Sequence, residues 1–273
     1  MKWLKLVLDF YINASIHVAL SVYCLVRITE LYFNLPYKES LNYFIFYATI
    51  TGYNFVKYAG VAKFHHRSLT NNLKIIQIFS LICFIAMCYY AYLLPLKTLL
   101  YCIPFEVLTI LYAVPFLSGF QKNLRNISYL KIIVVSFVWA GFTVVIPLLD
   151  AGIEIINNNL FYSFQRFLIV IVLILPFDIR DVKYDAISLQ TIPKKIGIPK
   201  TKKIGFTLML FALIIEFILS PTSQSKNVFM LFSFLVIMFL MRAKINQSKY
   251  YSSFWVEALP IFWWVILLGI HNF

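Results

Sequence analysis

The sequence predicts an all-α, polytopic integral membrane protein, and three observations support this fold class. Of the 273 residues, 62% are hydrophobic and only 13% are charged, which is far more apolar than a soluble domain. Apolar stretches of about 17 to 25 residues recur from end to end, and each can cross roughly 30 Å of hydrocarbon as a helix. No stretch is long and polar enough for a soluble domain, so residues 1–273 are expected to form a single transmembrane domain.

Nine transmembrane helices are expected, joined by short links. We predict them at residues 10–34, 41–63, 73–94, 98–118, 131–149, 161–178, 204–220, 227–241 and 254–271. The links are polar or contain proline, as in "NLPYKES", "LLPLKT" and "LSPTSQSKN", and such residues favour turns. The first apolar stretch is long and has no small-residue cleavage site, so we predict a retained helix rather than a signal peptide.

The distribution of Lys and Arg predicts the orientation of these helices, because cytoplasmic loops carry an excess of both residues. With the N-terminus inside the cell, nineteen of the 24 Lys and Arg residues lie on the cytoplasmic side. We therefore expect a protein of the cytoplasmic membrane with its N-terminus inside and its C-terminus outside. The net charge of +13 reflects this topology, so the lipid bilayer is an expected partner and nucleic acid is not.

The four cysteines and the common enzyme motifs give little sign of chemistry. Cys24, Cys83, Cys88 and Cys102 fall inside predicted helices with no histidine at metal-ligand spacing, so we expect them to act as small apolar core residues. A glycine-rich phosphate loop, HExxH and GxSxG do not occur in the sequence. The soluble-enzyme classes that depend on these motifs are therefore excluded.

The most distinctive stretch is "FDIRDVKYDAISLQTIPKKIG", which begins at Phe177 and ends at Gly197. Asp178, Asp181 and Asp185 lie at the cytoplasmic end of the sixth predicted helix, and they are three of only 11 acidic residues in the chain. If the helix continues through them, spacings of three and four residues place their carboxylates on one face. Carboxylates so close together repel one another near lipid unless a cation neutralises them. Oxygen ligands at this spacing suit Mg²⁺, which completes its shell with water and substrate phosphate oxygens.

Neighbouring basic residues leave a second interpretation of this stretch open. On a continuous helix, Arg180 and Lys183 point away from the three aspartates. In the alternative, the stretch is a solvated loop whose acids balance Arg180, Lys183 and Lys194. The following "SLQTIPKKIG" predicts a loop that interrupts the helix at Pro193 and a new helix that starts near Gly197.

The stretch "DIRDVKYD", the trailing "SLQTIPKKIG" and the nine-helix, N-in topology resemble the UbiA superfamily of intramembrane prenyltransferases. Members of that family have a second aspartate-rich motif between helices six and seven, followed by a glycine, a threonine or serine, a proline and a further glycine. Thr191, Pro193 and Gly197 fit this pattern, and Ser188 stands near where the family often has glycine. A weaker likeness is "LYAVPFLSGFQKNLRNISYLKI" after the fourth helix, where the family has tyrosine, proline and basic residues.

The resemblance implies a helical bundle around a central cavity that opens near the cytoplasmic leaflet. Two aspartate motifs of the family face each other there and hold a polyprenyl diphosphate through Mg²⁺. Loss of diphosphate leaves an allylic cation, which a lipophilic and often aromatic acceptor captures. By this likeness, Asp178, Asp181 and Asp185 are the expected catalytic residues and Mg²⁺ ligands. The expected substrate-binding residues are Asn54, Lys57, Tyr112, Lys122 and Arg125.

The sequence departs from the family in the first aspartate-rich motif, at the end of the second helix. The matching stretch here is "GYNFVKYAGVAKFHH". Asn54 matches the leading asparagine of the motif. Phe55, Tyr58 and Ala62 stand where the family has aspartates, and residues 40–105 contain no acidic residue. The metal-binding cluster that should face the second motif is therefore missing on one side.

Basic residues near this altered motif have two interpretations. Lys57 and Lys63, with His65 and His66 beyond them, either contact the diphosphate as fixed positive charges or are topology charges at the end of a helix. Lys57 lies about two turns inside the helix end, where an unpaired ammonium is unfavourable. We therefore expect Lys57 to find a partner in the cluster around Asp178.

Several other polar residues fall inside predicted helices. Glu106, Glu216 and Glu257 are expected to form hydrogen bonds between helices, since charged groups rarely face lipid. Arg27 and Glu30 are three residues apart near the outer end of the first helix, so we expect them to pair.

Two functions are open from the sequence. The first is a divergent prenyltransferase, a transferase that moves an isoprenoid chain from a polyprenyl diphosphate to a lipophilic acceptor, including aromatic quinone precursors. The second is a non-catalytic relative that binds an isoprenoid or quinone lipid or supports another membrane protein. The intact second motif favours catalysis, and the altered first motif counts against its usual form. A transporter is less favoured, because no paired helices broken by Gly or Pro indicate inverted repeats.

Overall fold

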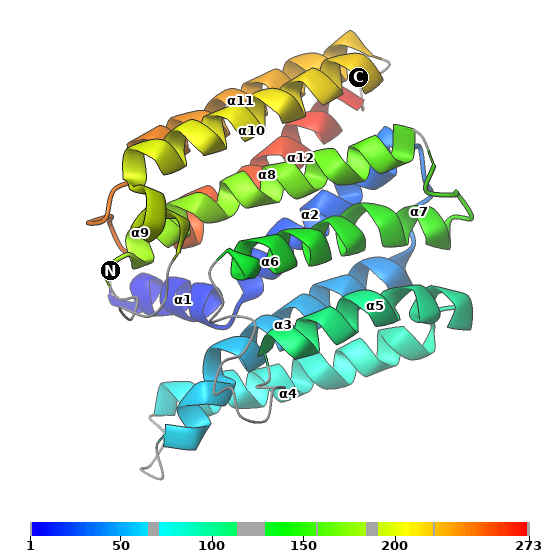
Figure 1. The fold of residues 1–273 in the computed structure, drawn as a ribbon. Coiled ribbons are helices and arrows are strands. Elements are labelled where there is room, and N and C mark those ends of the chain that lie inside the picture. The colour runs from blue at the N-terminus through cyan, green and yellow to red at the C-terminus, as the bar shows by residue number, and fades with distance from the viewer. Residues whose placement is uncertain are drawn as a thin grey trace.

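The computed structural model describes residues 2–64, 71–113, 129–156, 158–183, 191–220 and 222–271. Within these ranges the chain forms α-helices, two short π-helical segments and connecting turns, and no β-strand. The helices lie side by side in a bundle, with the first residues at one end and the last at the other (Figure 1). The all-α fold class is therefore confirmed.

The helices follow the predicted order along the chain. They are α1 (Lys2–Asn13), α2 (Ile16–Tyr32), α3 (Glu39–Phe64), α4 (Asn71–Tyr92), α5 (Leu96–Ala113), α6 (Leu130–Ala140), the π-helical η2 (Gly141–Val145), α7 (Ile146–Asp150), α8 (Asn158–Asp181), α9 (Ile192–Ile196), α10 (Ile198–Leu219), α11 (Ser223–Arg242), the π-helical η3 (Tyr251–Val256) and α12 (Leu259–His271). Helical structure fills most of the described part of each of the nine predicted ranges.

Six helical segments within the described ranges are long and apolar enough to cross a membrane. They are Leu73–Tyr92, Leu96–Ala113, Leu130–Asp150, Asn158–Asp181, Ser223–Arg242 and Tyr251–Ile270. The pair α1 and α2 makes a seventh if it is counted as one broken span. A polytopic membrane protein is therefore supported, and the number of nine membrane crossings stays a prediction.

The first predicted helix is wrong in one respect, because the structure breaks it in two. α1 ends at Asn13, α2 begins at Ile16, and the two helices are bent by 58°. Ser15 adopts a left-handed conformation with φ of 62° at the break. Neither glycine nor proline stands there, so no local residue preference predicts the bend.

α1 is an amphipathic helix. At 100° per residue, Lys5, Asp9 and Asn13 fall on one side, and apolar residues cover most of the rest. On the polar side, Lys249 and Tyr250 donate hydrogen bonds to Asp9, and this contact raises the pKa of Lys249 above its usual value. Apolar side chains are exposed on the first turns of α1, namely Trp3, Leu4, Leu6 and Val7.

Two large apolar clusters, with a third and smaller one around Ala19, Ile50 and Cys83, hold the described helices together. The first joins α2, α8, α10, α11 and α12 and includes Leu25, Leu175, Met209, Phe232 and Trp263. The second joins α2, α3, α5 and α7 and includes Val26, Phe44, Cys102, Phe105 and Ile146. α8 lies between α10 and α6 and packs against both (Figure 1), so it is a central helix of the bundle. The second aspartate-rich stretch begins in its last turn.

The outward faces of α4 and α5 are apolar. Only 11% of the α4 span and 17% of the α5 span are buried within the chain. A surface of this kind is unfavourable in water and matches hydrocarbon.

Cys88 is exposed on α4, so the prediction of four core cysteines is wrong for Cys88, whereas the other three cysteines are buried as predicted.

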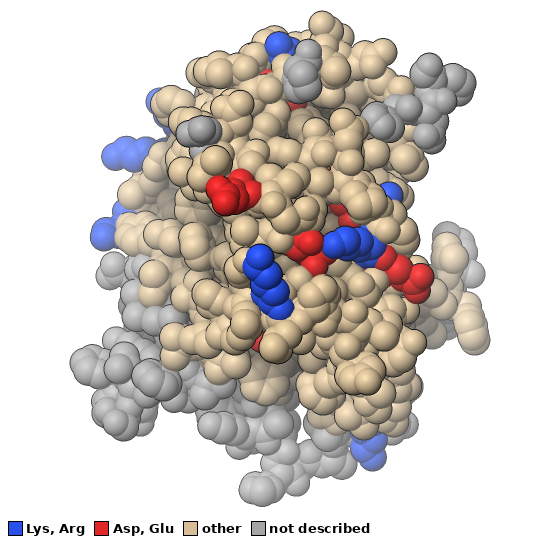
Figure 2. All heavy atoms as spheres, turned by 90° about the vertical axis from the view of Figure 1, so that its right-hand side faces the viewer, with Lys and Arg blue, Asp and Glu red and all other residues tan. Residues whose placement is uncertain are grey.

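Charged residues at the end opposite α1 include two ion pairs. Lys38 Nζ lies 2.7 Å from Asp150 Oδ2. Arg27 pairs with Glu30 on α2, as predicted, and Asn42 Nδ2 donates to Glu30 Oε1 at 2.5 Å. Figure 2 looks onto this end and shows positive and negative side chains beside one another on a face that is otherwise mostly uncharged.

Gly141 allows the helical run from α6 to α7 to approach α5 closely. We therefore expect a side chain at this position to disturb the packing. A Cβ atom added at Gly141 would overlap the ring of Phe105, whereas one added at Gly52 in α3 would meet nothing within 4 Å. Gly141→Ala should lower the free energy of unfolding by about 1–3 kcal/mol, because the ring cannot move without repacking. Gly52→Ala is the matched control and should be neutral or slightly stabilising. Thermal unfolding of detergent-purified variants tests this, and equal melting temperatures would contradict the packing.

Candidate functional site

The second aspartate-rich stretch lies at the end of α8. The apolar run of this helix leads through Pro176 to Asp178 and Asp181, where the helix ends. This end of α8 lies toward the same end of the bundle as α1 and α9 (Figure 1). Polar side chains from segments far apart in the sequence therefore meet near the last turn of α8.

Lys131 in the first turn of α6 forms an ion pair with Asp178. The ammonium Nζ lies 3.0 Å from Asp178 Oδ1. The side chain of Asp178 is only 2% exposed, whereas that of Lys131 is 28% exposed. Breaking a buried pair leaves an uncompensated charge at a cost of about 3–5 kcal/mol, so this contact ties α6 to α8. Nothing in the sequence spacing of Lys131 predicted this partner.

Arg180 and Asp181 pair with each other. Arg180 Nε donates to Asp181 Oδ1 at 2.8 Å, and both side chains are partly exposed. The prediction that Arg180 points away from the aspartates is wrong, because its long side chain turns back to the adjacent carboxylate at the helix end. A turn follows α8 at residues 182–183, so the continuous helix is not formed, and Asp185 lies outside the described residues.

The described carboxylates do not form a metal site. Asp178 and Asp181 each hold a cationic side chain, and the described ranges contain no group of three or more His, Cys, Asp or Glu residues that could hold a metal ion. A Mg²⁺ ion on Asp178 would have to displace an ammonium from a carboxylate that is almost inaccessible. The described residues of this stretch therefore do not fit the Mg²⁺ site that the family resemblance implies.

The other residues of the second motif form the link from α8 to α10. Thr191 directly precedes α9, and Pro193 lies in its first turn, where a missing backbone N–H costs little. Gly197 has φ of 83°, in the region that favours glycine, and α10 begins at Ile198. The predicted restart of the helix near Gly197 is confirmed.

Of the basic and aromatic residues expected after the fourth helix, the structure describes one. Tyr112 is buried near the end of α5, within electrostatic range of Lys131. Lys122 and Arg125 lie outside the described residues. Their roles in substrate binding, and that of Tyr112, stay predictions.

Asn54 has a structural role at the break between α1 and α2. Ser15 Oγ donates to Asn54 Oδ1 at 2.7 Å, and Asn54 Nδ2 donates to the carbonyl of Ala14 at 3.0 Å and to Ser80 Oγ at 2.8 Å. Both ends of the buried amide are thus engaged with α4 and with the break. A further role of Asn54 in substrate binding stays a prediction.

The positions where the family has aspartates in the first motif carry other side chains. Tyr58 OH donates to the carbonyl of Asn13 at 3.0 Å and so supports the same break. Phe55 is 51% exposed on α3. Within the described residues, this face of α3 serves the packing of α1 rather than metal binding.

Lys57 finds a different partner from the one predicted. Lys57 Nζ donates to Ser15 Oγ at 2.8 Å. Glu257, which lies between η3 and α12, is close enough to attract both Lys57 and Arg180. The prediction that Lys57 pairs with the aspartates at the end of α8 is wrong, because Lys131 is the partner of Asp178 and Arg180 is the partner of Asp181.

Six charged side chains form what we call the inner charge cluster. Its members are Lys57, Lys131, Arg180, Asp178, Asp181 and Glu257. Lys131 is paired with Asp178 and Arg180 with Asp181, and Glu257 lies near enough to Lys57 and Arg180 for their charges to act on it, so three basic and three acidic side chains gather here. The cluster brings together α3, α6, α8 and the segment before α12, and it is the strongest candidate for a functional site among the described residues.

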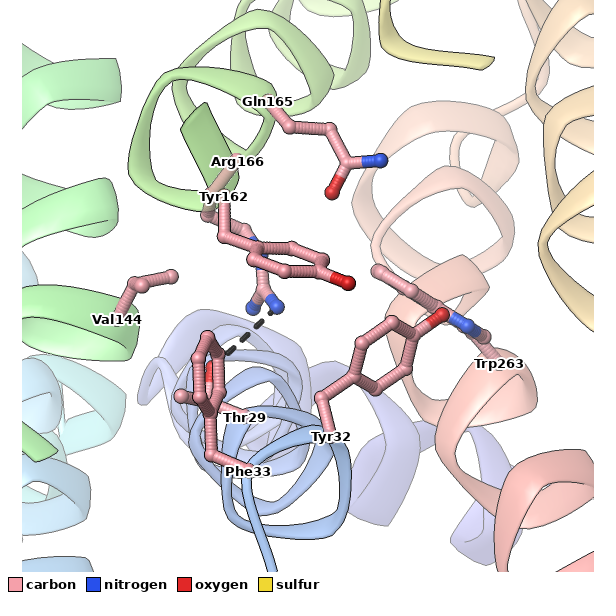
Figure 3. A pocket seen from close by; sticks show the side chains of 8 residues that line it. All are labelled: Thr29, Tyr32, Phe33, Val144, Tyr162, Gln165, Arg166 and Trp263. Carbon is pink, nitrogen blue, oxygen red and sulfur yellow. Dashed lines mark hydrogen bonds between the residues drawn. The ribbon is translucent and has the colours of Figure 1, made fainter. Parts of the chain in front are cut away.

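A second polar group lies in the opposite half of the bundle, around a small pocket (Figure 3). Figure 3 shows Tyr32, Tyr162 and Trp263 beside the side chain of Arg166. Arg166 is buried, and its guanidinium donates to the carbonyl of Leu25 at 2.9 Å and, more weakly, to Thr29 Oγ1 at 3.4 Å. Carbonyl and hydroxyl oxygens thus satisfy this buried cation, which indicates a structural role.

Glu216 joins three helices next to this pocket. Tyr32 OH donates to Glu216 Oε1 at 2.7 Å, and Gln165 Nε2 donates to Glu216 Oε2 at 2.9 Å. The predicted hydrogen bonds between helices are therefore confirmed for Glu216. Glu106 is exposed on α5 and forms no such bond within the described part of the chain, so the prediction is wrong there.

Comparison with solved structures finds similar folds in UbiA homologues from Archaeoglobus fulgidus. The homologue bound to GPP and Mg²⁺ has a TM-score of 0.58 and 12% identity, over 97% of this chain and 100% of that chain. The homologue bound to DMAPP and Mg²⁺ has a TM-score of 0.52 and 11% identity, over 97% and 95%. The homologue bound to Cd²⁺ has a TM-score of 0.55 and 12% identity, over all of both chains. No family model matches the sequence, and comparison with curated proteins gives no match.

These similarities confirm the UbiA-like helical bundle that the sequence resemblance implied, and the central cavity stays a prediction. The chain forms a UbiA-like helical bundle over nearly its whole length. Identity of 10–12% shows the fold and leaves the chemistry to the residues of the site.

The hydrogen bonds of Glu216 generate a prediction about stability. Glu216→Leu leaves Tyr32 and Gln165 without their shared acceptor, and each buried polar group left unpaired costs about 1–3 kcal/mol. We expect a clearly lower melting temperature for this variant in detergent. The matched control is Glu106→Leu, which removes an exposed carboxylate and should leave the melting temperature unchanged. Equal effects of the two substitutions would contradict the role assigned to Glu216.

Proposed function

We propose that this chain is an integral membrane protein that binds a polyprenyl diphosphate at the inner charge cluster and transfers its isoprenoid chain to a lipophilic acceptor, including aromatic quinone precursors. The observation that carries the proposal is the cluster itself. It lies on the stretch that resembles the second aspartate-rich motif, in a fold similar to that of homologues solved with GPP and DMAPP. Partly exposed cations suit the anionic head of such a ligand.

Aromatic side chains next to the cluster support the choice of an isoprenoid. Trp139 Nε1 donates to Tyr53 OH at 3.0 Å, which joins α6 to α3. Tyr53 lies near enough to Glu257 for their charges to interact, so this aromatic pair is in the region of the cluster. The negative faces of aromatic rings stabilise nearby cations and pack well against an unsaturated apolar chain.

The proposed reaction uses the residues of this chain in two ways. Lys131 and Arg180 bind phosphate oxygens and stabilise the negative charge that develops as the allylic C–O bond breaks. The bonding electron pair leaves with pyrophosphate, and the allylic cation forms a new bond to an electron-rich atom of the acceptor, which then loses a proton. In the family Mg²⁺ would assist departure of pyrophosphate, but the described residues of this chain do not fit it.

A non-catalytic function is the second candidate, and a specific observation favours it. Asn54 and Tyr58, at positions of the first motif, are engaged in hydrogen bonds that hold the break between α1 and α2. Because these residues hold the break, they do not supply the metal-binding acids that the reaction uses in the family. Such a chain can bind an isoprenoid or quinone lipid without reacting with it. Release of pyrophosphate separates the two candidates.

We also propose that the end of the bundle with α1 and α9 faces the cytoplasm. α1 then lies in the membrane surface, with its exposed apolar side chains among the lipids and Lys5 near anionic headgroups. This places the inner charge cluster toward the cytoplasmic leaflet, where a soluble diphosphate head can reach it.

Binding and turnover provide the direct test of the proposed function. Detergent-purified protein should bind geranyl or farnesyl diphosphate more tightly than inorganic pyrophosphate or geraniol, because the site recognises both the head and the chain. With a suitable aromatic acceptor, pyrophosphate should be released. Binding without release would support the non-catalytic function, and a failure to bind either diphosphate would contradict the prenyltransferase and leave a non-catalytic role on this fold.

The proposed orientation is tested with reporter fusions at the two ends of the chain. A fluorescent protein that folds only in the cytoplasm should be active at the N-terminus and inactive at the C-terminus. Alkaline phosphatase, which requires the oxidising exterior, should be active at the C-terminus only. The opposite pattern, or activity of one reporter at both ends, would overturn the predicted topology.

A further inference from the structure

We infer, on the basis of the proposed function, that fixed side-chain cations take the place of a divalent metal ion in binding the diphosphate, with Lys131 as the principal cation. The inference comes from a disagreement between two findings. The fold is similar to that of homologues solved with Mg²⁺ and a prenyl diphosphate. In this chain, Asp178 and Asp181 of the second aspartate-rich stretch are already paired with basic side chains.

The geometry of Lys131 and Asp178 supports a cation fixed in position. The ammonium is 3.0 Å from Asp178 Oδ1, and the carboxylate is 2% exposed. An approaching ligand therefore meets the ammonium, 28% of whose side chain is exposed, and not the carboxylate behind it. Asp178 acts as a positioning residue that holds the cation at the end of α8.

The ammonium of Lys131 retains the capacity to bind a phosphate. An ammonium has three N–H donors, and Asp178 takes one of them. The remaining N–H groups can donate to phosphate oxygens, as charge-assisted hydrogen bonds of the strong kind. A lysine ammonium behaves as a compact point charge, which is what a metal ion in this position would otherwise supply.

Two further cations complete the arrangement. Arg180 binds Asp181 through Nε, so its two terminal nitrogens are available for bidentate contact with a phosphate. Lys57 stands on α3, on the stretch that corresponds to the first aspartate-rich motif. A basic side chain is therefore present at each of the two places where the family is expected to hold metal ions with acids.

The test is equilibrium binding of geranyl diphosphate to the detergent-purified full chain, with excess chelator and with millimolar Mg²⁺. If fixed cations hold the diphosphate, the dissociation constant should differ by less than about twofold between the two conditions. Asp178→Asn should retain most of the binding, because the cation is kept and only its positioning partner is weakened. If the aspartate held a metal, the same variant would lose binding.

Removal of the cation is tested with a charge-neutral pair of substitutions. The double variant Lys131→Met with Asp178→Asn leaves no buried carboxylate unpaired, and it should weaken binding by at least about tenfold, as loss of a charge-assisted hydrogen bond predicts. The matched control is Lys38→Met with Asp150→Asn, which removes a similar pair, in which the aspartate is also 2% exposed, at the opposite end of the bundle. The control should lose stability without losing affinity, and melting temperatures show that both variants fold.

The outcomes separate this inference from the proposed function. Binding that needs Mg²⁺ and is lost in Asp178→Asn would overturn the inference and leave the proposed function standing. Binding in chelator that survives the loss of Lys131 would overturn the role of this residue. No binding by the unaltered protein in either condition would overturn the proposed function itself.

Discussion

The arrangement of this bundle depends on the rule that a charge buried among apolar helices must be paired or hydrogen-bonded. The helical run from α6 to α7 shows the rule at both of its ends. Lys131 pairs with Asp178 at the first turn, and Lys38 pairs with Asp150 at the last, with each carboxylate almost fully buried. Glu216 of α10 follows the same rule, because it accepts hydrogen bonds from Tyr32 on α2 and Gln165 on α8. The relative positions of α2, α3, α6, α8 and α10 are thus tied to polar contacts as well as to apolar packing.

The same constraint explains what became of the first aspartate-rich motif. Asn54, Lys57 and Tyr58 are spaced at three and four residues, so they share one face of α3. All three donate hydrogen bonds to the break between α1 and α2, where the backbone leaves its helix and exposes polar groups. Acids on this face would meet carbonyl oxygens rather than donors. Of the three positions where the family is expected to have aspartates, the one at Tyr58 is therefore used here to hold the break.

Much of the fold could be predicted from local sequence, and the site could not. The length of the apolar stretches predicted nine helical ranges, and helices occur in all of them. The preference of glycine for positive φ agrees with the start of α10 directly after Gly197. The bend at Ser15 depends on an amide 39 residues away, and the pair of Lys131 with Asp178 joins residues 47 apart. Periodicity reports which residues share a face of one helix and not which helix that face meets. The acidic members of the cluster on α8 were therefore foreseen, while the identity of their cations was not.

The change from metal ion to fixed cation has consequences for the chemistry. A divalent ion concentrates two charges between the oxygens that separate when pyrophosphate leaves, and it can move with them. A lysine ammonium carries one charge and is held by its own carboxylate, so it stabilises the charge that develops on the leaving pyrophosphate less than a divalent ion would. The proposed ionisation therefore demands more of this site than binding of the diphosphate does. Lys122 and Arg125 are the residues predicted to supply further positive charge.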